Sequence, residues 1–301
     1  MKFDITFLGT GQAIPTSSRN HVGILVSGFG ENMLFDCGEG IQRQFRKAHI
    51  SPTKITRIFI SHWHGDHVLG LPGLLQTISM SFEDKSKKIS IYGPHGIKRK
   101  IEDIIRLFPF YNKLDLGVHE ISEGAVLENK NFLVNAALMH HTIPCLAYSI
   151  IEKDQLRIDK ARLKKLKIPN SPLLAKLKQG KDIIINGKKI KADSLTHLEK
   201  GKKITIILDT KPNQNAVRLA KNSDILICES TYGDAEEDIA LEYSHMTSRQ
   251  AAQLAKDSKS EKLFLTHFSQ RYEGNEKELL RQASEVFKDA QLTKDLDKLS
   301  I

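Results

Sequence analysis

The stretch Ser61-His62-Trp63-His64-Gly65-Asp66-His67 places four metal-capable side chains within six positions. The apolar run that precedes it, residues 55–60, is typical of a buried strand. Three imidazoles and a carboxylate at a strand end would repel one another on protonation unless a cation organised them. Neutral imidazole and carboxylate suit zinc, with nickel, iron and manganese as weaker competitors. The stretch therefore predicts a centre for two metal ions.

The remaining ligands must come from other parts of the chain, because two ions need about eight ligand positions. His or Asp directly follows a strand-like run at three places: His140-His141 after residues 132–139, Asp209 after residues 204–208, and His267 after residues 263–266. A carboxylate can give one oxygen to each ion and hold the pair about 3.5–4 Å apart. We expect Asp209 to be this bridge.

Short β-branched or aromatic runs alternate with helix-like stretches along the chain. The expected strands cover residues 3–8, 22–26, 33–36, 55–60, 89–92, 132–138, 148–151, 204–208, 225–228 and 262–266. The expected helices cover residues 40–47, 69–79, 97–107, 213–221, 248–258 and 277–287. This pattern predicts an α/β fold of two sheets with outer helices, and the candidate ligands follow strand ends, where α/β folds place their sites.

Composition narrows the class of protein. The 301 residues are 40% hydrophobic, which is enough for a sizeable core, and no apolar run approaches the roughly 20 residues that span a bilayer. Met1 leads directly into a strand-like segment rather than a signal peptide. Cys37, Cys145 and Cys228 lie far apart, without a Cys-x-x-Cys pair, so neither a disulfide framework nor a thiolate zinc site is indicated. We expect a cytoplasmic protein.

The positive charge is concentrated in one segment. Residues 151–203 contain 16 Lys or Arg and 6 Asp or Glu, a net +10, so the rest of the chain carries −1 of the total +9. Solubility is served by interspersed charges, whereas a local basic block favours a polyanionic partner. We name residues 151–203 the arm and expect it to be an insertion in a single domain that covers residues 1–301.

Several motifs together resemble the tRNase Z (ribonuclease Z) family of the metallo-β-lactamase superfamily. Residues 61–67 resemble the metal motif of the whole superfamily. Two further matches are Asp36-Cys37-Gly38-Glu39-Gly40-Ile41-Gln42 and Glu229-Ser230-Thr231-Tyr232. Three motifs together narrow the resemblance to the family: the opening loop Phe7-Leu8-Gly9-Thr10-Gly11 with Pro15-Thr16-Ser17-Ser18-Arg19-Asn20, the motif His245-Met246-Thr247, and the closing motif Leu265-Thr266-His267-Phe268-Ser269-Gln270-Arg271-Tyr272. The resemblance implies a metallo-β-lactamase fold, a four-layer αββα sandwich with a protruding basic arm.

The resemblance also implies a division of the ligands between two Zn²⁺ ions, with Mn²⁺ as an alternative metal. One ion would be held by His62, His64, His141 and Asp209, and the other by Asp66, His67, Asp209 and His267. The family's ligand histidine precedes a tyrosine by seven positions, which favours His141 through Tyr148, and His140 is the alternative.

The family removes the 3′ trailer from precursor tRNA and leaves a 3′-hydroxyl after the discriminator base. The resemblance implies His245 as the proton donor to the leaving oxygen, Glu229 as its partner, and Asp66 in orienting the attacking water. Substrate contacts are expected from Arg19, Asn20, Ser269 and Arg271, and from the arm through Lys164, Lys165, Lys167, Lys176 and Lys178. A homodimer is expected, because family members commonly dimerise.

A rival hypothesis from the same superfamily is a small-molecule hydrolase, either a thioesterase or a cyclic-nucleotide phosphodiesterase. It explains the metal motif equally well, but it leaves the basic arm and the His245 motif unexplained. A non-catalytic RNA-binding protein would require lost ligands, and none is lost in the sequence.

Overall fold

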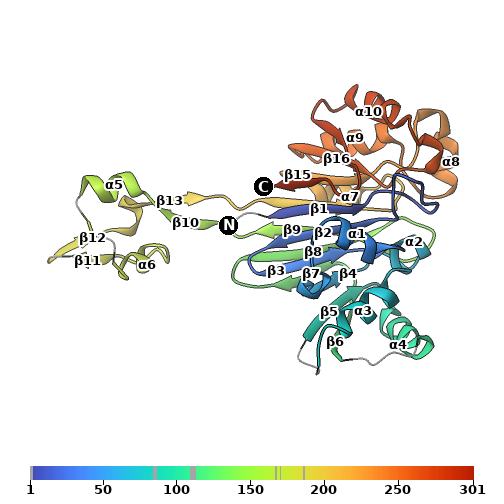
Figure 1. The fold of residues 1–301 in the computed structure, drawn as a ribbon. Helices are drawn as coiled ribbons and strands as arrows, with labels where there is room; N and C mark the ends of the chain where they lie inside the picture. The colour runs from blue at the N-terminus through green and yellow to red at the C-terminus, as the bar shows by residue number, and fades with distance from the viewer. Residues whose placement is uncertain (1–2, 84–86, 109–112, 167, 170, 186) are drawn as a thin grey trace.

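The computed structural model describes residues 3–83, 87–108, 113–166, 168–169, 171–185 and 187–301. Two seven-stranded sheets pack face to face, and each mixes parallel with antiparallel pairs (Figure 1). The first sheet contains β1 (Asp4–Gly9), β2 (Gly23–Gly28), β3 (Glu31–Phe35), β4 (Arg57–Phe59), β5 (Lys87–Gly93), β6 (Leu114–Glu120) and β18 (Lys298–Ser300), in the order β18-β1-β2-β3-β4-β5-β6. The second contains β7 (Gly124–Glu128), β8 (Phe132–Met139), β9 (Cys145–Glu152), β14 (Lys203–Ile207), β15 (Ile225–Glu229), β16 (Lys262–Thr266) and β17 (Ala290–Leu292), in the order β17-β16-β15-β14-β9-β8-β7.

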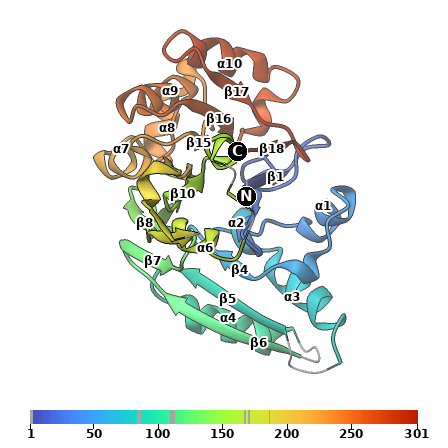
Figure 2. The ribbon, with the colours of Figure 1, turned by 90° about the vertical axis from the view of Figure 1, so that its left-hand side faces the viewer.

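Helices cover the outer face of each sheet, so the molecule has four layers (Figures 1 and 2). The first sheet is covered by α1 (Ile41–Lys47), α3 (Leu71–Ser79) and α4 (Ile97–Leu107), with the short α2 (Gly65–Val68) beside them. The second sheet is covered by α7 (Gln214–Ala220), α9 (Ser248–Asp257) and α10 (Glu276–Ser284), with α8 (Glu237–Glu242) nearby. Short 3₁₀ turns lie at Pro52–Lys54, Ala192–Ser194, Asp234–Glu236 and Gln270–Tyr272.

The main core lies between the sheets. Phe7, Val134 and Ile206 are fully or almost fully buried there, and two further apolar layers lie between each sheet and its helices. The burial pattern explains the strand types. Every residue of β15 is buried, because the strand lies between two neighbours with both faces covered. By contrast, residues of β8 alternate between buried and half-buried over most of its length.

The two ends of the described chain meet in the first sheet. β18 pairs antiparallel with β1, with Asp4 opposite Ser300 and Thr6 opposite Lys298. The hydroxyl of Thr10 also donates to Asp295 at 2.7 Å. The strand at one edge of this sheet therefore comes from the last residues of the sequence.

The arm leaves the second sheet between β9 and β14 as an antiparallel ribbon of β10 (Gln155–Ile158) and β13 (Thr196–Glu199). Beyond the ribbon lie α5 (Lys160–Lys165), α6 (Leu174–Leu177) and the hairpin of β11 (Ile183–Ile185) and β12 (Lys188–Ile190), well away from the sandwich (Figure 1). Leu174, Leu177 and Leu195 form a small apolar cluster of their own there. The tip of the arm thus has its own packing and does not rest on the main core.

Candidate metal centre

The chemistry-bearing residues converge from both sheets. His62 and His64 lie in the loop after β4, and Asp66 and His67 lie in α2. The second sheet supplies three further ligand candidates, each beyond the end of a strand: His141 after β8, Asp209 after β14 and His267 after β16. Each sheet therefore provides about half of the site, as the strand-end pattern of the sequence predicts.

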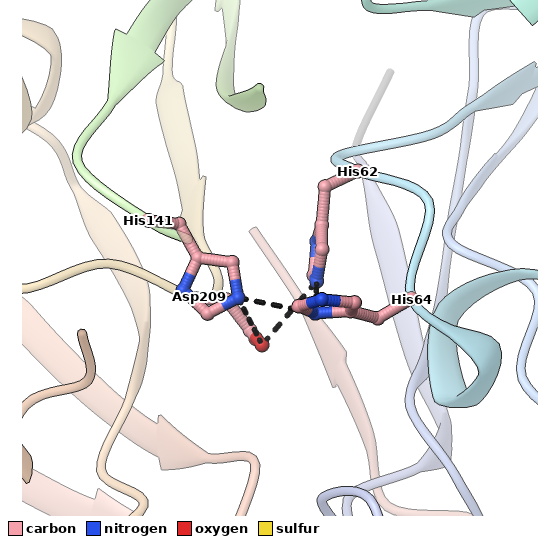
Figure 3. A group of neighbouring side chains, drawn as sticks. All are labelled: His62, His64, His141 and Asp209. Carbon is pink, nitrogen blue, oxygen red and sulfur yellow. Dashed lines mark hydrogen bonds and ion pairs between the residues drawn. The ribbon is translucent and has the colours of Figure 1, made fainter. Parts of the chain in front are cut away.

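One group consists of His62, His64, His141 and Asp209, which we name site one (Figure 3). His64 Nδ1 lies 3.0 Å from His62 Nε2 and 3.2 Å from His141 Nε2. Asp209 Oδ2 lies 3.5 Å from His62 Nε2 and 3.7 Å from His141 Nε2. Four donor atoms thus face one another at distances that suit a shared cation between them.

A second group consists of Asp66, His67 and His267, which we name site two, with Asp209 on its border. Asp209 Oδ1 lies 3.3 Å from His67 Nε2 and 3.2 Å from His267 Nε2. All three of these atoms are buried and have no hydrogen-bond partner. Buried polar atoms in folded proteins are almost always partnered, so three such atoms aimed at one point fit a metal ion as their shared partner.

Asp209 turns a different oxygen toward each site. Oδ1 faces His67 and His267, whereas Oδ2 faces His62 and His141. The buried His and Asp clusters are therefore consistent with a binuclear metal site, and imidazole with carboxylate is the donor set that suits zinc.

The ionisation states favour metal binding. Burial, together with the neighbouring His67, holds the pKa of His62 well below its usual value, so its imidazole is neutral. Burial alone would raise the pKa of Asp209, but His267 and His67 outweigh it and keep the carboxylate ionised. Burial alone would lower the pKa of His67, but Asp209 and Asp66 raise it well above its usual value. The site thus attracts positive charge, which a proton or a metal ion can supply.

Asp36 supports the centre from behind. Its Oδ2 accepts from His67 Nδ1 at 2.6 Å and from the Ser61 hydroxyl at 2.6 Å, and its Oδ1 accepts from the Ser61 backbone N–H at 2.7 Å. Asp36 has a left-handed backbone with φ of 55°, and His267 has φ of 61°. Such conformations cost of order 1–3 kcal/mol each and concentrate at functional sites. Asp36 therefore directs His67 Nε2 toward site two.

His245 lies beside the metal cluster. Its Nδ1 is 3.1 Å from both oxygens of Glu229, and its Nε2 is 3.8 Å from Asp209 Oδ2. Burial alone would lower the pKa of His245, but the carboxylates of Glu229 and Asp209 outweigh it and raise the pKa to about 9. An imidazolium held in this way can give up a proton from Nε2.

Relatives of the chain identify its family. It is 37% identical over 308 residues to ribonuclease Z of Streptococcus uberis, an alignment that covers 99% of the chain and 100% of the relative. It is 38% identical over 308 residues to ribonuclease Z of Streptococcus equi subsp. equi, with the same coverage. The chain belongs to the ribonuclease Z family.

Solved structures agree with membership of the ribonuclease Z family. The human short-form tRNase Z has a TM-score of 0.73 and 31% identity over 99% of both chains. A metallo-β-lactamase fold protein, YhfI from Bacillus subtilis, has a TM-score of 0.72 at 17% identity, which shows the fold alone. A family model described as anti-Pycsar protein Apyc1 matches residues 3–106. The resemblance to ribonuclease Z and the metallo-β-lactamase fold are therefore confirmed.

The structure distinguishes the two histidines that the sequence left open. His141 turns its ring into site one, and its Nδ1 lies 3.1 Å from the Ser244 carbonyl. His140 is exposed at the surface. The position that matches the ribonuclease Z motif is thus the one that the fold brings into the cluster.

Arg19, an expected substrate contact, makes several contacts within the protein. Its guanidinium donates to Thr10 Oγ1 at 2.6 Å and to the Thr293 carbonyl at 2.9 Å, pairs with Glu276 at 3.0 Å and lies over the Phe268 ring. The residue is buried, and its Nε and Nη1 atoms are hydrogen-bonded within the protein. Arg19 therefore supports the opening loop of this ribonuclease Z homologue, and its contact with a substrate stays a prediction.

The other expected substrate contacts are more varied. Asn20 is half-buried and donates to the Glu39 carbonyl at 2.6 Å, and Ser269 is buried. Arg271 is exposed, with its guanidinium 5.3 Å from the Tyr232 ring centroid. The arm residues Lys164, Lys165, Lys176 and Lys178 are exposed, and Lys167 lies outside the described residues. Arg271 and these four lysines are thus exposed, and their contacts with a substrate stay predictions.

Sequence reasoning did not give Asp36 a role in the site. The signal was present, because Asp36 follows a strand-like run in the same way as Asp209. Its partner could not be read from the sequence, since the hydrogen bond to His67 joins residues 31 positions apart.

Proposed function

We propose that this protein is a metal-dependent endoribonuclease that removes the 3′ trailer from precursor tRNA, cutting after the discriminator base to leave a 3′-hydroxyl. Three observations support the proposal: membership of the ribonuclease Z family, the paired clusters around Asp209, and His245 beside them. The single observation that carries it is the convergence of orphaned donor atoms on Asp209, next to a histidine whose protonated form is stabilised.

The residues divide the work. Two zinc ions held by site one and site two would lower the pKa of water and offset the charge that develops on a phosphate. His245 holds a proton at Nε2 for the leaving 3′-oxygen, because Glu229 occupies its Nδ1. Asp66, whose pKa stays below its usual range because His67 outweighs the effect of burial, is an ionised carboxylate that can orient the attacking water. Arg271 is exposed close to His245 through Tyr232 and can contact the substrate phosphate.

The arm would bind the body of the tRNA away from the scissile bond. Its exposed lysines lie in or directly after α5 and α6, beyond the ribbon that projects from the sandwich, and their charges are suited to phosphates (Figure 1). We further propose that the protein acts as a homodimer in the cytoplasm, and the molar mass in solution from light scattering tests the oligomeric state. None of the helices in the described part of the chain is long and apolar enough to cross a membrane.

The test uses a 5′-labelled precursor tRNA with a 3′ trailer, incubated with the purified protein with and without a chelator. We expect a metal-dependent cut directly after the discriminator base, lost in Asp209→Ala and retained in the exposed control Asp115→Ala. An inert tRNA combined with turnover of a thioester or a cyclic nucleotide would instead assign the protein to the rival class of small-molecule hydrolases.

A further inference from the structure

The hydroxyl of Thr231 lies between the two functional halves of the centre. Thr231 is fully buried, two residues beyond Glu229. Its Oγ1 lies 2.6 Å from Glu229 Oε2 and 3.1 Å from His267 Nδ1. His245 Nδ1 is farther from this hydroxyl, at 3.4 Å. The side chain thus contacts both a ligand candidate of site two and the partner of the proposed proton donor.

The direction of these hydrogen bonds follows from the chemistry of the groups. His267 Nε2 faces Asp209 Oδ1 without a hydrogen-bond partner, so the ligand form of the ring carries its proton on Nδ1. That N–H can donate to Thr231 Oγ1. The ionised carboxylate of Glu229 can only accept, so the Thr231 O–H donates to Glu229 Oε2. The chain of hydrogen bonds therefore runs one way, from His267 through Thr231 to Glu229.

Glu229, at the end of this chain of hydrogen bonds, accepts several hydrogen bonds at once. It also accepts from the backbone N–H groups of Thr210 at 2.6 Å and Met246 at 3.1 Å, and from His245 Nδ1. Site one has separate supports: Ser61 Oγ lies 2.9 Å from His62 Nδ1, and the Ser244 carbonyl lies 3.1 Å from His141 Nδ1. No contact of this kind joins Thr231 to the four site-one residues, all of which are described.

We infer that Thr231 is a positioning residue for site two: its hydroxyl holds His267 in the tautomer that leaves Nε2 free for the metal and ties this ligand to the Glu229–His245 pair. The inference rests on the proposed metal centre, and not on the identity of the RNA substrate. Mutation of a residue that hydrogen-bonds to a metal-ligating histidine typically lowers metal affinity by about 10–100-fold. Loss of the Thr231 hydroxyl should therefore weaken one of two ions and spare the other.

The protein is first stripped of metal with a chelator under native conditions. It is then titrated with Zn²⁺ in the presence of a chromophoric chelator that competes for the metal, which gives a separate affinity for each ion. We expect wild type to bind two ions, and Thr231→Val to bind one ion normally and the other about 10–100-fold more weakly. Thr231→Ser keeps the hydroxyl and should restore both affinities. Thr266→Val is the matched control. Thr266 is a buried threonine next to His267, and the Thr266 hydroxyl has no hydrogen-bond partner.

Equal affinities in wild type and Thr231→Val would overturn the inference, as would equal weakening of both ions or a similar effect in Thr266→Val. If Thr231→Val fails to fold by circular dichroism, Thr231→Ala provides the same comparison with Thr231→Ser. Wild-type protein that binds two ions but leaves precursor tRNA uncut would contradict the proposed function, while the zinc titrations would still decide the role of Thr231.

Discussion

His245 is the residue on which the proposed chemistry depends most directly. Its distance of 3.8 Å to Asp209 groups it with the metal ligands, but its contact with Glu229 gives it a different role. We predict that His245→Ala retains two bound ions and loses about 10²–10⁴-fold in kcat on precursor tRNA, the range that general acid catalysis contributes.

A leaving-group comparison separates this role from a ligand role. Bis(p-nitrophenyl) phosphate releases a nitrophenolate that needs no proton, so its hydrolysis by His245→Ala should stay within a few-fold of wild type, on the order of 1 kcal/mol or less in barrier. Similar losses on both substrates, or the loss of a bound ion, would show that His245 acts as a ligand.

Glu229 should control the pH at which His245 gives up its proton. The carboxylate of Glu229 raises the pKa of His245 to about 9, against the effect of burial, so the protonated donor persists at pH 7–8. Glu229→Gln removes the negative charge and should lower that pKa. The alkaline limb of the kcat profile would then move to lower pH, which a pH series on precursor tRNA measures. If the alkaline limb of the kcat profile did not move, that limb would report the ionisation of a group other than His245.

The clustering of the candidate ligands could be predicted from the sequence, because the segments that carry them follow strand ends. Their supports could not, because they depend on contacts between distant segments. Asp36 meets His67 only when neighbouring loops of the first sheet are assembled, and Thr231 meets His267 only when neighbouring loops of the second sheet are. The burial of Arg19 is of the same kind, since its partners Thr293 and Glu276 lie more than 250 positions away.

At the scale of elements, β9 ties the second sheet to the metal loop of the first. The Tyr148 hydroxyl donates to the Ile60 carbonyl at 2.7 Å, and the Leu146 N–H donates to the Ser61 carbonyl at 2.9 Å. The Tyr148 ring packs on Phe59 with centroids 5.3 Å apart. These contacts fix the two halves of the centre relative to each other.

We predict that Tyr148→Phe destabilises the protein by about 1–3 kcal/mol, because it leaves the buried Ile60 carbonyl without this donor. Urea unfolding of the metal-free protein measures the change. Tyr92→Phe, in the same ring stack, is the matched control, since the Tyr92 hydroxyl makes no hydrogen bond within the described chain. Equal stability of Tyr148→Phe and wild type would show that the hydrogen bond from Tyr148 to the Ile60 carbonyl does not stabilise the protein.

Helices and strands were predictable where burial of one face gave the sequence a periodic pattern of apolar residues. The β16 strand and the α4 helix have the boundaries that the sequence predicts. The β6 and β7 strands were missed, because β6 buries only Leu114 and β7 buries none of its residues. Both are edge strands, so their sequences lack the apolar runs that mark an interior strand.

At the scale of the whole molecule, the arm should separate tRNA binding from phosphodiester chemistry. We predict that replacing residues 155–199 with a short Gly-Ser linker lowers kcat/KM on precursor tRNA at least about 10-fold and leaves hydrolysis of bis(p-nitrophenyl) phosphate unchanged, because the role that we propose for the arm is to bind phosphates far from the scissile bond. The salt dependence of tRNA binding should also fall by about 0.7–0.9 log units per log salt for each phosphate that the arm neutralises in the wild-type complex.

A charge variant tests the same surface without removing it. Lys164, Lys165, Lys176 and Lys178 are exposed, so their joint replacement by Ala should weaken tRNA binding while the apolar cluster at the tip keeps the arm folded. Equal losses on tRNA and on the small substrate would contradict a separate binding role for the arm.

The pairing of β18 with β1 has a consequence for synthesis on the ribosome. Strand β1 has one neighbour, β2, at residues 23–28, but the other, β18, only at residues 298–300. Between them the ribosome must produce the second sheet and the arm. One edge of β1 therefore stays unpaired during translation, and an unpaired strand edge is a surface on which nascent chains aggregate. This edge can close only after β18 has left the exit tunnel.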